Sequence, residues 1–503
     1  MKGTIILTVT AFFTKILSML YKIPYQNVVG DEGLYVFQQV YPLVGVYTIL
    51  NGVVLPTVIS ELLLTYQYSD GIKRYIKRSL WMIGLASFAL LFLGSNMIAI
   101  AMGDAGLSSA IRVVGLAFLF MPILSYLRGV MQANPNTIRR LGYSTTIEQL
   151  VRVTMIIMVL VQLRGHNMYQ IAYFSYLLGL GGPILAILYL WLFKGEDVPS
   201  GTLNIQTRPH FFKKSLYLFL SAGILILFQL IDSFVVFNSL VASGISEVNA
   251  MQLKGVFERG LPIVQTATFF VGAIISGMVP QMSKLKDEKS RHDVFNTAVF
   301  FVFALAIPAC IGLFVVMDDL NATLFIDNAG SDALRILSIQ VVLYAFVFLT
   351  TAVLQQEGKY SQLLVSVLAG ILVKLVLTAP LTESLGINGT AISSVSALGV
   401  MFLINSVQFR KMFYPKTYFN LLRITAAALG MWWVVDRTRP WIMANIFFHE
   451  GRTYNMNLLF AQAGIGIVVY GVLLFLLLWV AVITNDIKKR KKRQRRKRQM
   501  EKL

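Results

Sequence analysis

Apolar runs of membrane-spanning length recur along the whole 503-residue chain. About 20 mostly apolar helical residues cross the roughly 30 Å hydrocarbon core of a bilayer. The runs are continuously apolar and lack the alternation of barrel strands, so they predict helices. Only 14% of the residues are charged, against about 25% in soluble domains. The sequence therefore predicts an all-α polytopic membrane protein and argues against a water-soluble enzyme.

Fourteen transmembrane helices are predicted, arranged as six, six and two. We expect an N-terminal lobe in residues 1–205, a C-terminal lobe in residues 206–416, additional helices in residues 417–487 and a basic cytoplasmic tail in residues 488–503. The loops are too short to hold a separate catalytic domain. The predicted spans lie near residues 4–23, 35–62, 79–102, 109–131, 144–163, 169–193, 212–238, 259–282, 294–317, 333–356, 361–381, 386–409, 418–435 and 456–483.

Lysine and arginine are distributed unevenly over the two sides of these spans. One side receives 31 of them and the opposite side receives 6. Because cytoplasmic loops carry the excess of Lys and Arg, both termini are predicted to be cytoplasmic, which requires an even number of spans. The final 16 residues contain 11 Lys and Arg residues. Directly after a span, such a tail is predicted to contact anionic membrane lipids, and no nucleic-acid partner is expected.

An internal repeat is indicated by similar residues at a nearly constant separation. The offset of about 223 residues covers six spans, so both copies insert with the same polarity. We therefore expect two lobes related by a pseudo-twofold axis along the membrane normal, with a cavity between them. The matching positions are Pro56 with Pro280, Gln132 with Gln355, and Arg152 with Lys374.

Motifs for covalent chemistry, cofactors and metals are missing from the sequence. It contains no phosphate-binding Gly-x-x-x-x-Gly-Lys-Ser/Thr loop, no Gly-x-Ser-x-Gly elbow and no His-Glu-x-x-His motif. Cys310 is the single cysteine, and the four histidines are scattered. No enzymatic activity, cofactor or metal site is therefore expected.

Charged residues inside the predicted spans are the candidates for function. Each Lys or Arg at mid-depth costs about 2.5 to 3.5 kcal/mol on insertion scales. Lys15 and Lys22 share one helix face and form a stripe about 10 Å long. Opposed by Arg259, such a stripe is predicted to line a cationic cavity, where Lys and Arg bind phosphate through charge-assisted hydrogen bonds. The full set of substrate-binding candidates is Lys15, Lys22, Arg152, Asp232, Glu258, Arg259 and Lys374.

Structural roles remain open for several of these residues. Lys22 is also suited to reaching the membrane interface. Glu148 and Arg152 have the i, i+4 spacing of a helical ion pair. Asp232 is interpreted either as an acid paired with a basic residue across the lobes or as a proton or sodium site. Lys374 is alternatively a structural partner for an acid.

The N-terminal residues resemble a known transporter family. They are similar to the polysaccharide-biosynthesis, stage V sporulation protein B branch of the multidrug/oligosaccharidyl-lipid/polysaccharide exporter superfamily, which is related to MurJ-type lipid II flippases. The predicted six, six and two spans agree with that superfamily over the whole chain. The residues that carry the resemblance are Phe13-Thr14-Lys15, Tyr21-Lys22-Ile23-Pro24-Tyr25 and Gly30-Asp31-Glu32-Gly33-Leu34-Tyr35.

This resemblance implies a two-lobed flippase that works by alternating access. It implies that Lys15 and Arg259 hold a lipid pyrophosphate, with Glu258 beside Arg259 and Lys22 as a further basic residue. The expected substrate is an undecaprenyl-pyrophosphate-linked oligosaccharide, foremost the peptidoglycan precursor lipid II. The expected location is the bacterial plasma membrane, with cell-wall synthesis proteins as further partners.

Three other functions stay open on the sequence. One is export of another polyprenyl-linked glycan, of the capsule or teichoic acid type. The second is a cation-coupled multidrug antiporter on the same fold, which would favour membrane-embedded carboxylates. The third is a non-transporting scaffold for cell-wall assembly, which would need no charged cavity.

Overall fold

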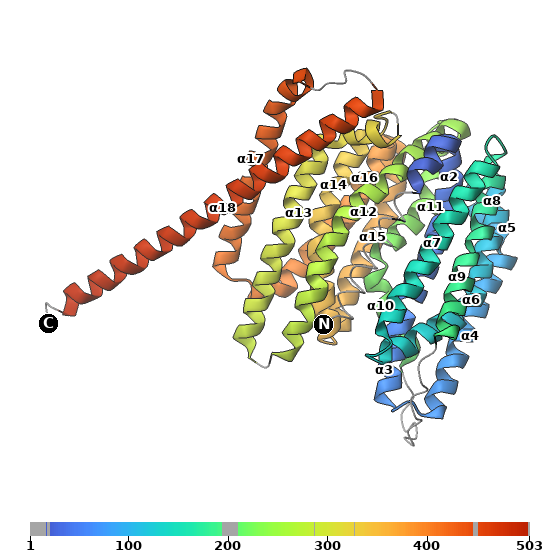
Figure 1. Ribbon diagram of the computed structural model, residues 1–503, viewed down its shortest axis with the longest axis horizontal. Coiled ribbons are helices and arrows are strands. Elements are labelled where there is room, and N and C mark those ends of the chain that lie inside the picture. The colour runs from blue at the N-terminus through green and yellow to red at the C-terminus, as the bar shows by residue number, and fades with distance from the viewer. Residues whose placement is uncertain are drawn as a thin grey trace.

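The protein is built from helices (Figure 1). The computed structural model describes residues 17, 21–193, 210–285, 287–325, 327–445 and 451–500, and no strand occurs among them. The helices before residue 194 are α2 (Lys22–Ile49), η1 (Leu50–Val54), α3 (Leu55–Thr65), α4 (Asp70–Leu93), α5 (Ser95–Ala101), η2 (Ala105–Leu107), α6 (Ser108–Ala133), α7 (Ile138–Gln162), α8 (Met168–Gly179) and α9 (Gly181–Leu192). Those after residue 209 are α10 (Phe211–Ala222), α11 (Ile224–Ala242), α12 (Glu247–Lys284), α13 (Glu288–Phe325), α14 (Ser331–Gln356), α15 (Tyr360–Leu385), α16 (Ile387–Phe409), η3 (Arg410–Met412), α17 (Pro415–Asn445) and α18 (Gly451–Met500).

Twelve segments of the described chain are long and apolar enough to cross a membrane. Most of the first predicted span lies outside the described residues. The predicted span at 259–282 lies within α12, a continuous helix of 38 residues that is not among the twelve. The polytopic helical fold is therefore confirmed, whereas the number fourteen stays a prediction.

Several predicted spans are interrupted helices. The helix α2 contains a break at Gly30. The φ of 74° at this residue lies in the left-handed region, which glycine adopts far more readily than other residues do. The predicted span at 79–102 is divided at Gly94, between α4 and α5, and the span at 212–238 is divided at Gly223, between α10 and α11. In contrast, α18 continues through the basic tail to Met500, because Lys, Arg and Gln are good helix formers.

The helices pack in two groups. Before residue 194, α6 contacts α3, α4, α8 and α9, while α7 packs on α8 and α9. After residue 209, α14 contacts α12, α13 and α16, and α15 packs on α11 and α16. The helices α17 and α18 contact α13 and flank the second group (Figure 1). The predicted boundary at residue 205 lies outside the described residues, and the assignment of the lobes stays a prediction.

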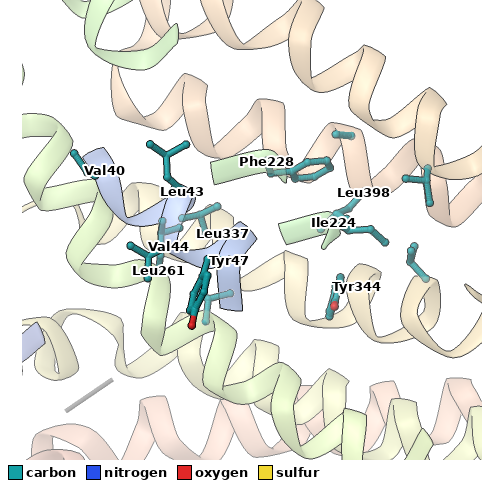
Figure 2. Close-up of a cluster of buried hydrophobic side chains, with 14 of the residues drawn as sticks. Val40, Leu43, Val44, Tyr47, Ile224, Phe228, Leu261, Leu337, Tyr344 and Leu398 are labelled. Atoms are coloured by element: carbon teal, nitrogen blue, oxygen red, sulfur yellow. The ribbon is translucent and has the colours of Figure 1, made fainter. Parts of the chain in front are cut away.

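Helix α2 joins the two groups, since it packs against α11 and α12. Figure 2 shows apolar side chains of α2 close to those of the second group. These buried side chains form an apolar layer where α2 meets the second group, and burying them removes apolar surface from water. Its members are Val40, Leu43, Val44 and Tyr47 of α2, Ile224 and Phe228 of α11, Leu261 of α12, Leu337 and Tyr344 of α14, and Leu398 of α16.

Candidate functional site

Six of the seven predicted site residues are described, and Lys15 lies outside the described residues. The structure brings Asp232, Glu258 and Lys374 into one cluster in the second helix group. Arg152 and Arg259 lie in other surroundings on α7 and α12, whereas Lys22 of α2 lies close enough to Glu258 for their opposite charges to interact. The predicted candidates therefore form several charged sites rather than one shared group.

The first site is a buried quartet of Lys254, Glu258, Asp232 and Lys374. The Lys374 Nζ lies 2.6 Å from the Asp232 Oδ1. The Lys254 Nζ donates a hydrogen bond of 2.7 Å to the backbone oxygen of Asp232 and lies 3.9 Å from the Glu258 Oε1. Two ammonium groups thus face two carboxylates, which removes most of the cost of burying each charge alone. Asp232 and Lys374 both belong to the second helix group, so their pair does not cross the predicted lobes.

Lys22 lies on α2 and is buried with aromatic and amide partners. Its Nζ donates to the Gln38 Oε1 at 3.1 Å and lies 4.6 Å from the centre of the Tyr41 ring. Only 6% of Lys22 is exposed. The alternative in which Lys22 reaches the membrane interface is therefore not the arrangement that the structure shows.

Arg152 belongs to a charge cluster on α6 and α7. Its Nη2 donates to the Glu148 Oε1 at 2.7 Å, and the Nη2 of Arg128 donates to the other oxygen of Glu148 at 2.7 Å. The i, i+4 ion pair expected from the sequence is present, with a second arginine added. Since two guanidinium groups share this one carboxylate, the three residues carry a net positive charge.

A small cavity lies next to this cluster. Arg152 lines it together with Tyr21, Tyr41, Tyr47 and Tyr176, and its volume is about 30 Å³. That is room for about one water molecule. Because Tyr41 contacts Lys22 as well as this cavity, the ring connects the two basic side chains. In this conformation the cavity is too small for a sugar or a diphosphate.

Arg259 connects α12 with two other segments and is fully buried. Its guanidinium donates to both oxygens of Asp31 at 3.2 Å, to Asp327 and to the backbone oxygen of Ala329 at 2.9 Å. We call Arg259, Asp31 and Asp327 the latch. The prediction of Arg259 as an open phosphate ligand opposite Lys22 does not describe this conformation, because two acids neutralise it.

The break at Gly30 explains why the latch can form. It turns the chain so that Asp31 of α2 meets α12. There, a Cβ on Gly255 would lie 2.0 Å from the backbone oxygen of Asp31. Only glycine permits this approach without a displacement of the backbone. Next to the latch, the Gln252 side chain donates to the Glu32 Oε1 at 2.8 Å.

The Asp327 carboxyl lies in the segment between α13 and α14. Partial burial raises the pKa of Asp327, but hydrogen bonds from Arg259 and the Ala329 N–H more than offset this effect and hold the pKa below its usual value. Asp327 therefore carries a negative charge at neutral pH. The latch is ionic under these conditions.

Sequence reasoning missed two buried basic residues. The charge count includes Arg128 among the 31 basic residues of one side and Lys254 among the 6 of the other, yet their exposed fractions are 1% and 0%. The Lys254–Glu258 spacing of i, i+4 was the available signal for one of them. Removing both residues from the loop counts leaves 30 against 5, so the asymmetry that predicts the orientation is unchanged.

Residues 1–286 match the sequence profile of the family described as Polysaccharide biosynthesis protein. The chain belongs to this family. The match covers more than half of the 503 residues and includes α2, Arg152 and the α12 segment with Glu258 and Arg259. The predicted resemblance is therefore confirmed.

Relatives of this polysaccharide biosynthesis family protein occur in Bacillus subtilis (strain 168). It is 29% identical over 447 residues to the uncharacterized membrane protein YabM, covering 86% of this chain and 84% of the relative. It is 23% identical to the lipid II flippase MurJ, covering 79% and 80% of the two chains. It is 22% identical to the stage V sporulation protein B, covering 82% and 83%.

Solved structures with the same fold include flippases and drug transporters. A lipid II flippase MurJ in an inward closed conformation matches with a TM-score of 0.72 and 14% identity, covering 96% of this chain and 99% of the other. An inward-facing multidrug resistance MATE family transporter of the MOP superfamily matches with a TM-score of 0.59 and 17% identity, covering 79% and 95%. At these identities the likeness shows the fold alone.

Together these findings define the class of the protein. It is a multi-pass membrane protein of the polysaccharide biosynthesis family with bacterial relatives that include the lipid II flippase MurJ, and it shares its fold with transporters of the MOP superfamily. Members of this transporter class carry out no covalent chemistry, so the expectation of a transporter rather than an enzyme is confirmed.

Proposed function

We propose that this protein moves a polyprenyl-pyrophosphate-linked oligosaccharide, foremost lipid II, from the inner to the outer leaflet of a bacterial plasma membrane. The observation that carries the proposal is the surplus positive charge of Arg128 and Arg152, which share the carboxylate of Glu148 beside the tyrosine-lined cavity. Such a surplus in a dry interior complements a diphosphate. Lys22 adds a further basic group on the far side of Tyr41.

The site must widen before it can hold such a head group. The cavity next to Arg152 measures about 30 Å³, and the apolar layer closes the interface beside it (Figure 2). Separation of α2 from α11 and α12 would open a path from one membrane side to Lys22 and Arg152. Alternating access supplies such a step, because the two helix groups meet through a layer without covalent or metal links in the described residues.

An apolar groove elsewhere suits the polyprenyl chain. It lies between α12, α13, α17 and α18, has a volume of about 560 Å³, and is lined by Pro308, Gly312, Trp432, Gly466 and Ile467 among other residues. Small residues leave room along helix surfaces, and the apolar lining matches a hydrocarbon chain. The head group would thus travel between the helix groups while the chain stays in lipid or in this groove.

Depletion of the protein in its host tests the proposal. We expect a polyprenyl-pyrophosphate-linked glycan to accumulate in the inner leaflet, which lipid extraction and mass spectrometry identify. Accumulation of lipid II supports lipid II as the substrate. Accumulation of a capsule or teichoic acid precursor would instead identify that precursor as the substrate. If no lipid-linked glycan accumulates and cells become sensitive to cationic drugs, the protein is a drug exporter and the proposal is wrong.

A matched pair of variants tests the charge argument. Arg152→Gln removes the surplus charge while Arg128 still balances Glu148, so the protein should reach the membrane in normal amounts but fail to replace the depleted protein. Arg139→Gln changes an exposed arginine at the start of α7 and should restore growth fully. Full activity of Arg152→Gln would contradict the proposed role of the surplus positive charge. If the unmodified protein also flips no lipid-linked glycan, a role as a scaffold is favoured.

A further inference from the structure

The ammonium group of Lys374 lies inside a cage of oxygen atoms. Its Nζ lies 2.6 Å from the Asp232 Oδ1, and it donates to the Ser394 Oγ at 2.7 Å and to the Ser393 Oγ at 3.1 Å. The Thr378 hydroxyl lies 3.2 Å from the Ser393 Oγ. One carboxylate and several hydroxyl groups therefore converge on a single positive charge.

This cage is closed and belongs to three helices. Lys374 and Thr378 lie on α15, Asp232 on α11, and Ser393 and Ser394 on α16. Lys374 and Ser393 have no exposed surface, and the others are at least nine-tenths buried. Next to the cage, Lys254 donates a hydrogen bond to the backbone oxygen of Asp232 at 2.7 Å.

The ligands of Lys374 are those that a small alkali cation would take. Hard cations bind carboxylate, hydroxyl and carbonyl oxygens, and a buried carboxylate needs a positive partner of some kind. A lysine at this position supplies that partner from the chain itself. The side chain tethers this partner to α15, so that it cannot diffuse out of the site as a free ion can.

We propose that Lys374 is a built-in cation that occupies an alkali-metal-type site, so that this transporter takes up no mobile sodium ion there. The site would then be neutral throughout transport. The inference goes beyond the proposed function, because it holds for any substrate. Removal of the lysine side chain would then create a sodium site from Asp232, Ser393 and Ser394.

Thermal melting of the purified full-length protein tests this inference. Lys374→Ala should melt at a lower temperature than the unmodified protein in N-methylglucamine chloride. NaCl of equal ionic strength should raise its melting temperature in a saturable manner, as expected for a ligand that binds only the folded state. The unmodified protein should melt at the same temperature in both salts. Equilibrium dialysis with radioactive sodium should detect one bound ion in Lys374→Ala and none in the unmodified protein.

Two further variants serve as controls. Lys374→Met fills the space of the lysine stem but offers no cation, so it should be destabilised without any response to sodium. Asp232→Asn combined with Lys374→Ala removes the carboxylate as well as the ammonium and should also lose the sodium response. A sodium response in either control would assign the effect to another part of the protein and overturn the inference.

Sodium measurements on the unmodified protein test the inference even if Lys374→Ala does not fold. Saturable stabilisation or binding of sodium by the unmodified protein would overturn the inference directly. A folded Lys374→Ala variant that melts at the same temperature in both salts would do so as well. Neither result would affect the proposed glycan substrate, which depends on Arg152 rather than on Lys374.

Discussion

At the scale of single residues, the buried charged side chains of this protein lie next to partners of opposite charge. Breaking a buried ion pair by removing one partner costs about 3 to 5 kcal/mol, because the other charge is left uncompensated. Arg259 has two acid partners and Glu148 has two arginine partners. Loss of Arg259 should therefore lower the stability of the folded protein more than loss of an exposed charge.

Arg259→Gln should open the latch. Each tenfold change in an opening equilibrium corresponds to about 1.4 kcal/mol, so loss of this buried cation should raise opening at least about tenfold. A reporter is available at Ser233, whose backbone oxygen accepts a hydrogen bond from Gln39 of α2 at 2.7 Å. In a Cys310→Ser background, Ser233→Cys should react at least about tenfold faster with a maleimide when Arg259 is replaced.

Arg335→Gln is the control for this experiment. Arg335 pairs with Asp318 and Asp332 within the second helix group, and it makes no contact with α2 among those described. Its replacement should leave the labelling rate of Ser233→Cys unchanged. Equal rates for Arg259→Gln and Arg335→Gln would show that the latch does not hold the helices together.

The latch should also respond to acid in a defined range. Because the folded-state pKa of Asp327 lies below its usual value, its carboxylate stabilises the folded protein above about pH 4, and this contribution is lost as the pH falls through the folded pKa. Melting temperatures of the unmodified protein and of Asp327→Asn should therefore differ at pH 6, and the difference should shrink as the pH falls below about 4. A constant difference over this range would contradict the assignment.

At the scale of elements, the contact between α2 and α12 depends on one glycine. A Cβ at position 255 would lie 2.0 Å from the backbone oxygen of Asp31 and 2.7 Å from its carbonyl carbon. Since neither atom belongs to a flexible side chain, the two helices must move apart. Inserting an atom into such a contact costs about 1 to 3 kcal/mol.

Gly255→Ala should therefore favour separation of α2 and α12 at the latch. We expect faster maleimide labelling of Ser233→Cys and a lower melting temperature. Gly277→Ala, on the same helix, is the control because nothing lies within 4 Å of the added Cβ. If both variants label at the same rate, the close approach at Gly255 does not limit opening.

At the scale of the whole molecule, the orientation is a prediction that labelling can test. In a Cys310→Ser background, Ala242→Cys reports on the end of α11 and Lys289→Cys on the start of α13, and both positions are exposed. The charge asymmetry places Lys289 in the cytoplasm and Ala242 outside. A membrane-impermeant maleimide should label Ala242→Cys in intact cells and Lys289→Cys only after permeabilisation. The reverse pattern would contradict the predicted orientation.

The sequence by itself determined the features that depend on local patterns. Apolar runs predicted the helices, because a bilayer leaves few alternatives for an unpaired backbone. The i, i+4 spacing predicted the pair of Glu148 and Arg152, because helix geometry fixes neighbours within one turn. Family membership followed from the N-terminal motifs and is confirmed by the match of residues 1–286.

Only the tertiary structure decided which distant charges meet. Arg259 pairs with Asp31 across 228 residues of chain, and Lys374 meets Asp232 rather than lining a shared phosphate cavity. Helical periodicity gives the face on which a side chain lies, but not the height at which that face meets another helix. That height depends on contacts such as Gly255 with Asp31 and on the break at Gly30, whose effects appear only when the helices are packed.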